Sequence, residues 1–100
     1  MSNMKKYKDI VAFHPGYYIE AIIEDKGISK AEFATRMGTT PIALNLLING
    51  QTNISNDLAK KLSAMLGTSI EVWKNLQTSY DQKLIEIQHA KYIDKKTYTF

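Results

Sequence analysis

The chain of 100 residues contains no cysteine and only two histidines. Without cysteine it forms neither a disulfide framework nor a thiolate zinc site. His14 and His89 lie far apart with no metal-ligand spacing between them, and the serines lack a paired histidine and acid at the spacing of a hydrolase. We therefore expect no metal, no cofactor and no catalysis.

Long apolar runs are missing as well. No segment approaches the roughly 20 apolar residues of a membrane span, and the N-terminal run MSNMKKYKD is not followed by the apolar core of a signal peptide. These absences favour a cytoplasmic protein without a membrane partner. Apolar residues still make up 44% of the chain, which is enough for one small core. The formal net charge of +3 permits nucleic-acid binding without requiring it.

Residues 29–50 predict two short helices that cross at a tight turn. Ser29 and Glu32 form a capping box that starts the first helix, and Thr40 followed by Pro41 caps the second. The small and apolar residues that let the two helices pack closely are Phe33, Ala34, Met37, Gly38, Leu44 and Leu47. This combination is typical of a DNA-binding helix-turn-helix.

Two further helices are expected on either side of this pair. His14 caps one that begins at Pro15 and ends at Gly27. Ser55 caps another, which ends at Gly67. Both carry apolar residues at helical spacing, so each is expected to pack one face against the helix-turn-helix.

The last helix carries a long apolar face. A second capping box, Thr68 with Glu71, starts this helix, which could reach about 20 residues or roughly 30 Å. Side chains of its buried face follow at alternating steps of four and three: Trp73, Gln77, Tyr80, Leu84 and Ile87. Because so small a bundle cannot cover the far end, we expect a second copy of the chain to pack there, with these five residues as dimer contacts. The alternative is that they pack on preceding helices of the same chain.

These elements divide the chain into three parts. Residues 1–12 form an N-terminal extension that is expected to be flexible and to dock its apolar side chains just before the first helix. Residues 13–90 form an all-α domain of five helices, and no strand pattern competes within 16–89. Residues 91–100 form a C-terminal tail that is either disordered or a short extended arm.

Four segments of the chain carry a family resemblance. They are HPG at 14–16, SKAEFATRMG at 29–38, LINGQTNIS at 47–55 and LGTSIEVWKNLQTSYD at 66–81. Together they resemble the HigA family of antitoxins, within the larger Xre/Cro-like helix-turn-helix group. The resemblance covers about residues 13–88 and implies a lambda-repressor-like fold with a long C-terminal helix. It also implies a dimeric antitoxin that neutralises a RelE/HigB-like mRNA-cleaving toxin and represses their shared promoter by binding operator double-stranded DNA.

Candidate DNA contacts lie on and around the second helix of the pair. They are Lys30, Arg36, Thr39, Thr40, Pro41, Ile42, Ala43, Asn45, Leu46, Asn49, Gln51 and Thr52. Base edges are read by hydrogen bonds, yet only Thr40, Asn45 and Asn49 among the groove-facing residues can donate or accept, and this helix has no cation. Two interpretations remain. The helix could read an A/T-rich DNA site weakly, or the exposed apolar residues of this face could be buried in an interface with another protein.

The resemblance places the toxin contact away from the recognition helix. Candidate contacts are Ile10, Phe13, Tyr17, Tyr18, Glu20 and Glu24. They would block the toxin by covering its basic RNA-binding groove, which the two glutamates complement in charge. It is equally open that the apolar members of this set simply cover the core.

Three functions are therefore compatible with the sequence. The first is a HigA-like antitoxin that also represses its promoter, the second is a free-standing Xre-family transcriptional regulator, and the third is an antitoxin that binds only protein. A neighbouring open reading frame for a small basic toxin would favour the first and third over the second.

Overall fold

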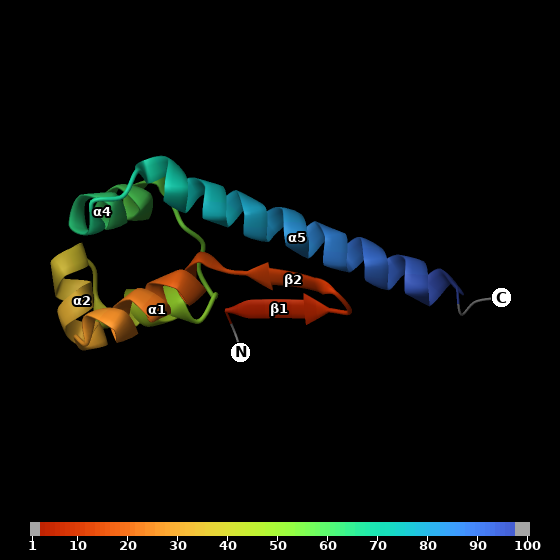
Figure 1. Cartoon of the computed structure of the whole chain (residues 1–100), viewed down its shortest axis with the longest axis horizontal. Helices are drawn as coiled ribbons and strands as arrows, with labels where there is room; N and C mark the ends of the chain where they lie inside the picture. The colour runs from red at the N-terminus through yellow and green to blue at the C-terminus, as the bar shows by residue number, and fades with distance from the viewer. Residues whose placement is uncertain (1–2, 98–100) are drawn as a thin grey trace.

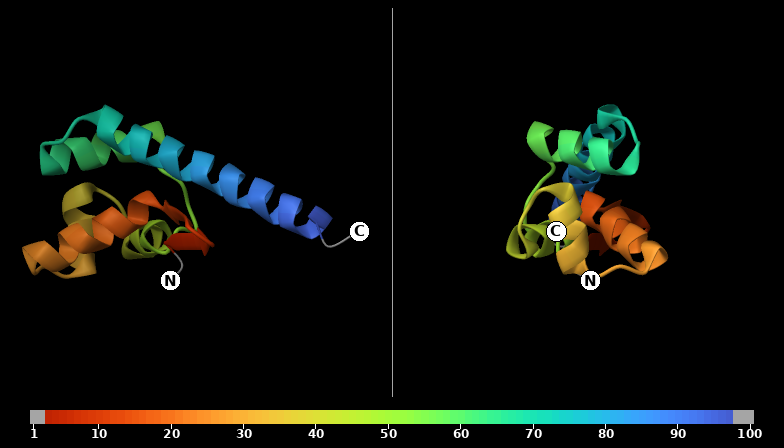
Figure 2. Two further views of the ribbon diagram at one scale, coloured as in Figure 1. Left: turned by 45° about the vertical axis from the view of Figure 1, so that its right-hand side comes forward. Right: turned by 90° about the vertical axis from the view of Figure 1, so that its left-hand side faces the viewer.

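The computed structural model describes residues 3–97, which form a two-stranded hairpin followed by five helices (Figure 1). The elements are β1 (Met4–Tyr7), β2 (Ile10–Phe13), α1 (Pro15–Lys26), α2 (Lys30–Met37), α3 (Pro41–Ile48), α4 (Asn56–Leu66) and α5 (Ile70–Thr97). The first four helices gather at one end, and α5 extends from them as a long rod (Figures 1 and 2). This arrangement confirms the predicted five-helix fold. Within the described part of the chain, no helix is both long and apolar enough to cross a bilayer.

The predicted capping residues start the helices as expected. The hydroxyl groups of Ser29, Thr40 and Ser55 each accept a hydrogen bond, at 3.0–3.1 Å, from the backbone N–H three residues further on. Each bond satisfies an N–H group that has no partner inside its own helix. At the turn between α2 and α3, Gly38 adopts a φ of 81°, a backbone conformation that glycine accepts without strain.

The start of α5 differs from the prediction by one residue. Ser69 is the cap, because its hydroxyl accepts a hydrogen bond from the N–H of Val72 at 3.2 Å. The hydroxyl of Thr68 instead accepts the indole N–H of Trp73 at 2.9 Å. The predicted capping box of Thr68 with Glu71 is therefore wrong, since the Thr68 side chain is bound to the buried tryptophan.

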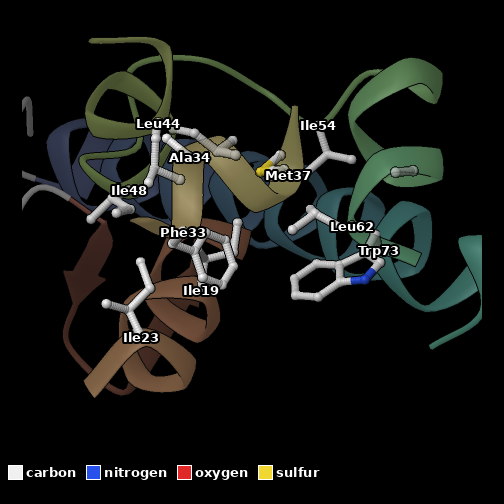
Figure 3. Packing of buried hydrophobic residues seen from close by; sticks show 12 residues of the cluster. Ile19, Ile23, Phe33, Ala34, Met37, Leu44, Ile48, Ile54, Leu62 and Trp73 are labelled. Carbon is white, nitrogen blue, oxygen red and sulfur yellow. The ribbon is translucent and has the colours of Figure 1, made fainter. Parts of the chain in front are cut away.

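The main core lies among α1 to α4 and the first turns of α5. Its buried members are Ile19, Ile23, Phe33, Ala34, Met37, Leu44, Leu47, Ile48, Ile54, Ala59, Leu62 and Trp73. Phe33 and Ile19 lie together, and Trp73 and Leu62 form a neighbouring pair (Figure 3). Because every helix contributes, the core fixes α3 firmly against the rest of the bundle.

The beginning of α1 lies directly against the end of α3. A Cβ atom added to Gly16 would lie 2.2 Å from the carbonyl oxygen of Leu47 and 2.7 Å from that of Ile48. These oxygens belong to backbone, which cannot rotate away as a side chain would. Only glycine at position 16 therefore permits this approach of the two helices.

The N-terminal segment is a hairpin and not the flexible extension that was predicted. β1 and β2 pair in antiparallel register, with Met4 opposite Phe13 and Tyr7 opposite Ile10. The hairpin lies along α5 and forms a second apolar cluster with it (Figure 1). Its members are Ala12, Tyr80 and Ile87, which are buried, and Tyr7, Ile10 and Leu84, which are partly buried. The prediction that apolar side chains dock here is confirmed.

The predicted tail also differs, because residues 91–97 continue α5 as helix. Residues 98–100 lie outside the described part. The tip of the hairpin is tied to this helical extension: Lys8 Nζ lies 2.7 Å from Asp94 Oδ2, and the Tyr7 hydroxyl donates to the same carboxylate. The bond from Lys8, and to a smaller extent the bond from Tyr7, lowers the pKa of the Asp94 carboxyl. Lys91 lies over the Tyr7 ring at 5.5 Å.

Candidate nucleic-acid interface

α3 turns one face to the core and the other outward. Leu44, Leu47 and Ile48 are buried in the main core. On the opposite face Ile42 is 76% exposed, and Asn45 is exposed beside it. Such a face, held from behind by the core, is what entry of a helix into the major groove requires.

The polar groups available on this face are few. The side-chain oxygen of Thr40 accepts the helix-capping hydrogen bond from Ala43, and Thr39 and Ala43 are only half-exposed. The amides of Asn45 and Asn49 remain exposed. An exposed asparagine can form two hydrogen bonds with the edge of adenine, whereas α3 carries no cation for guanine.

Cations flank α3 on its neighbouring helices. Lys30 is exposed in the first turn of α2. Arg36 is held at 2.9 Å by Glu32 on the same helix, in an exposed pair that costs little to open. Lys61 of α4 donates to the carbonyl of Gly38 at 3.2 Å, which links α4 to the turn of the helix-turn-helix.

The loop after α3 adds further exposed polar residues. Gln51, Thr52 and Asn53 are exposed. The backbone N–H of Ile54, which follows them, donates to Oε1 of Gln77 on α5 at 2.8 Å. Gln77 was predicted as a dimer contact, and its helical spacing carried no signal that it binds this loop.

The residues predicted for the dimer face are covered within one chain. Trp73 belongs to the main core, Gln77 binds the loop, and the hairpin covers Tyr80 and Ile87. Leu84 packs partly buried against the same hairpin cluster. The N-terminal strands thus cover most of the face that was assigned to a second copy, and the dimer itself stays a prediction.

The residues predicted for the toxin contact are brought together only in part. The rings of Phe13 and Tyr17 lie 4.8 Å apart between centroids, and those of Tyr17 and Tyr18 lie 5.5 Å apart. We call these three residues the aromatic patch. Glu24 is exposed, and Glu20 accepts a hydrogen bond from the Asn3 side chain at 3.1 Å. Ile10 instead packs against the α5 cluster, away from this patch.

His14 has the predicted role of helix cap. Its Nδ1 accepts a hydrogen bond from the backbone N–H of Gly16 at 2.9 Å, and the ring is fully buried. Burial lowers the pKa of His14, so the folded state favours the neutral ring. Among residues 3–97, no group of three histidine or acidic side chains could hold a metal ion.

The model of the helix-turn-helix family matches residues 19–73, more than half of the chain. The chain belongs to the helix-turn-helix family. Within it, an uncharacterized transcriptional regulator of Escherichia coli, YddM, is 32% identical over 81 residues, which are 77% of this chain and 86% of that one. Virulence-associated protein A' of Dichelobacter nodosus is 39% identical over 78 residues, covering 77% and 68%.

Solved helix-turn-helix structures include several antitoxins. A putative antidote protein of a plasmid maintenance system from Nostoc punctiforme superimposes with a TM-score of 0.77 at 32% identity, covering 89% of this chain and 97% of that one. A HigA-family addiction module antidote protein from Coxiella burnetii gives 0.72 at 30% identity, covering 83% and 91%. The Pseudomonas aeruginosa antitoxin HigA with its higBA promoter also gives 0.72, at 27% identity, covering 83% and 91%. These neighbours confirm the resemblance to HigA-type antitoxins.

Proposed function

We propose that this chain is a HigA-type antitoxin that represses its own promoter by binding operator DNA through α3 and the residues beside it. The observation that carries the proposal is the exposed outer face of α3, which the core holds rigidly. The likeness to an antitoxin solved with its promoter supports this use of the face. In this arrangement Asn45 bonds to adenine, and Ile42 contacts a thymine methyl group. Specificity for an A/T-rich operator follows.

Phosphate contacts come from the flanks of α3 in this proposal. Lys30 is exposed in the first turn of α2, and Gln51 and Thr52 are exposed in the loop after α3. Such contacts set the position of a protein on the duplex and carry no sequence information of their own. They release counterions, so the logarithm of the binding constant should fall with the logarithm of the salt concentration by about 0.9 per phosphate.

The test is binding to a labelled duplex from the DNA upstream of the chain's own gene. Lys30→Ala should weaken binding on every duplex and reduce the salt slope by about 1. Asn45→Ala should instead lower the preference for the operator over a mixed-sequence duplex, by about 1–3 kcal/mol. Lys83→Ala is the matched control, because Lys83 pairs with Glu86 on α5, away from α3. A salt response that is flat for the unmodified protein would refute the proposal.

The toxin in this proposal is a RelE/HigB-like mRNA-cleaving protein, bound by the aromatic patch and the glutamates beside it. Exposed aromatic rings bury a large area at a small entropic cost, which makes them effective at protein interfaces. Glu20 and Glu24 complement a basic RNA-binding groove. Covering that groove blocks mRNA without any chemistry on the antitoxin.

Co-purification with the protein encoded next to this gene tests the pairing. Tyr17→Ala with Tyr18→Ala should weaken the complex with the toxin by at least tenfold. Tyr92→Ala, an exposed tyrosine of α5, is the control. Equal toxin binding by the double variant and the control would place the toxin elsewhere.

A second candidate function, an antitoxin that binds only protein, is favoured by one observation. The recognition helix exposes Ile42 and Leu46 and has no cation. Ile42→Asp should abolish toxin binding if this face contacts protein, and should affect only DNA binding if it contacts an operator. The free-standing regulator differs from both, because it would have no toxin partner.

A homodimer completes the proposal, since two copies can read two half-sites of an operator. Its interface requires other residues, because the chain itself buries four of the predicted contacts on α5, namely Trp73, Gln77, Tyr80 and Ile87. Sedimentation at micromolar concentration should give twice the mass of one chain, and a single-chain mass would refute the dimer.

A further inference from the structure

The loop between α3 and α4 is short, polar and close to the proposed DNA surface. Gln51, Thr52 and Asn53 are exposed, so they lack a packed side chain that would hold them in place. Ile54 follows directly and is buried in the main core. The start of the loop is tied to α3, because the N–H of Gln51 donates to the carbonyl of Leu46 at 2.8 Å. The position of Thr52 and Asn53 therefore depends on what holds the backbone at and beneath Ile54.

Gln77 of α5 holds the end of this loop from inside the protein. Its side chain is only 8% exposed, and its Oε1 accepts the buried N–H of Ile54 at 2.8 Å. Its Nε2 donates to Oδ1 of Asp81, one turn further along α5, at 3.0 Å. The second bond fixes which end of the amide faces the loop. A buried N–H that loses its acceptor is costly, so the backbone is confined to the place where this bond forms.

His14 meets the same loop from the other side. Its Nδ1 accepts from Gly16, which assigns the proton of the neutral ring to Nε2. The ring lies near the carbonyl of Thr52 and the side chain of Asn53, although Nε2 forms no hydrogen bond with any described residue. Tyr80 packs edge-on against the ring, 5.0 Å between centroids. The loop is thus backed by α1 and α5 together.

We propose that Gln77 is a positioning residue for DNA binding, which holds Thr52 and Asn53 where they contact the phosphate backbone. The inference rests on the DNA-binding part of the proposed function. Gln77 itself touches no DNA and acts through the bond to the N–H of Ile54. Loss of this bond should remove phosphate contacts while base reading by α3 is retained, because the main core continues to hold α3.

The test uses Gln77→Met, which keeps the length of the side chain and removes the acceptor. Gln82→Met, at an exposed position of the same helix, is the matched control. Gln77→Glu combined with Asp81→Asn is the rescue variant, since it restores an acceptor for Ile54 and reverses the bond along α5 without changing the net charge. Each protein is titrated with a labelled mixed-sequence duplex and with the upstream duplex over a range of salt concentrations.

The expected result is a salt slope reduced by about 1 to 2 in Gln77→Met, with the preference for the upstream duplex over the mixed sequence unchanged. The control and the rescue variant should keep the slope of the unmodified protein. A slope that is unchanged in Gln77→Met, or reduced and not restored by the rescue variant, overturns the proposal. A loss of sequence preference without a change in slope also overturns it.

Amide hydrogen exchange separates this inference from the proposed function. In Gln77→Met the amides of residues 52–54 should exchange at least about tenfold faster, while those of α2 change much less. If the unmodified protein binds neither duplex, the DNA-binding function and the DNA role of Gln77 both fall, and exchange still reports whether Gln77 holds the loop. If Gln77→Met does not fold, the exposed variant Asp81→Ala decides: unchanged loop exchange overturns the positioning role.

Discussion

The two apolar clusters of this protein differ in how they hold the elements around them. The main core draws buried residues from all five helices, whereas the cluster beneath the hairpin buries only Ala12, Tyr80 and Ile87. The first cluster supports the recognition helix, and the second supports the far half of α5. We infer that the bundle unfolds as one cooperative unit, while the hairpin and the distal part of α5 open more readily and by themselves.

The largest effect is expected in the main core. Phe33 is fully buried, so Phe33→Ala should lower the free energy of unfolding by about 3–5 kcal/mol. Chemical denaturation measures this loss. Ile42→Ala, on the exposed face of α3, is the control and should change stability by less than about 0.5 kcal/mol. A loss below about 1 kcal/mol for Phe33→Ala would mean that the bundle is not built around this cluster.

A smaller and more local effect is expected beneath the hairpin. Ile87→Ala truncates one of the three buried side chains of this cluster. It should lower the free energy of opening of the hairpin and distal α5 by about 2–3 kcal/mol. Amide exchange should therefore accelerate in β1, β2 and the distal half of α5, and much less in α2 and α3. Equal acceleration in all of these elements would contradict the division into two units.

The stability of the bundle is expected to depend on pH through His14. Burial lowers the pKa of His14 below its ordinary 6.5, so the unfolded chain binds more protons than the folded chain as the pH falls through that value. The stability of the bundle should therefore be lower at pH 5.5 than at pH 7.5. His14→Asn keeps a helix-capping acceptor and should flatten this dependence when denaturation midpoints are compared. An unchanged dependence in the variant would assign it to other groups.

The smallest effect is expected at the hairpin tip, where the side chain of Asp94 is half-buried. Its pKa is lowered by Lys8 and Tyr7, so its contribution is present above its ordinary value of 3.8 and is lost as the pH falls through the lowered pKa. Asp94→Asn should slightly accelerate amide exchange at the hairpin tip near neutral pH and leave the bundle unchanged. Faster exchange in α1 or α4 as well would show that the two regions are coupled.

The same contrast explains what the sequence could predict. Helix boundaries within the bundle are set by local chemistry, such as the hydroxyl groups of Ser29, Thr40 and Ser55, and these could be read directly. The outward face of α3 followed from the spacing of Leu44, Leu47 and Ile48, which the core requires. In both cases the residues that decide the structure are neighbours along the chain.

The missed features depend on contacts between distant segments. β1 has only four residues, MKKY, and the two lysines in its middle leave little of the alternation that predicts a strand. It is a strand because it pairs with β2, and the hairpin lies along α5. The helical extension over 91–97 is likewise stabilised where Asp94 meets Lys8, 86 positions earlier in the chain. Gln77 was recognised as a buried position of α5, but periodicity does not identify the group that a buried side chain binds.

The close approach at Gly16 has a consequence for the orientation of α3. The amino end of α1 faces the carbonyl end of α3, an arrangement in which the two helix dipoles attract. The orientation of α3, and so the angle at which it would meet a duplex, thus depends on the absence of a side chain at position 16. A side chain at position 16 would therefore have to move α3 relative to α1, while every side chain on the outer face of α3 stays unchanged.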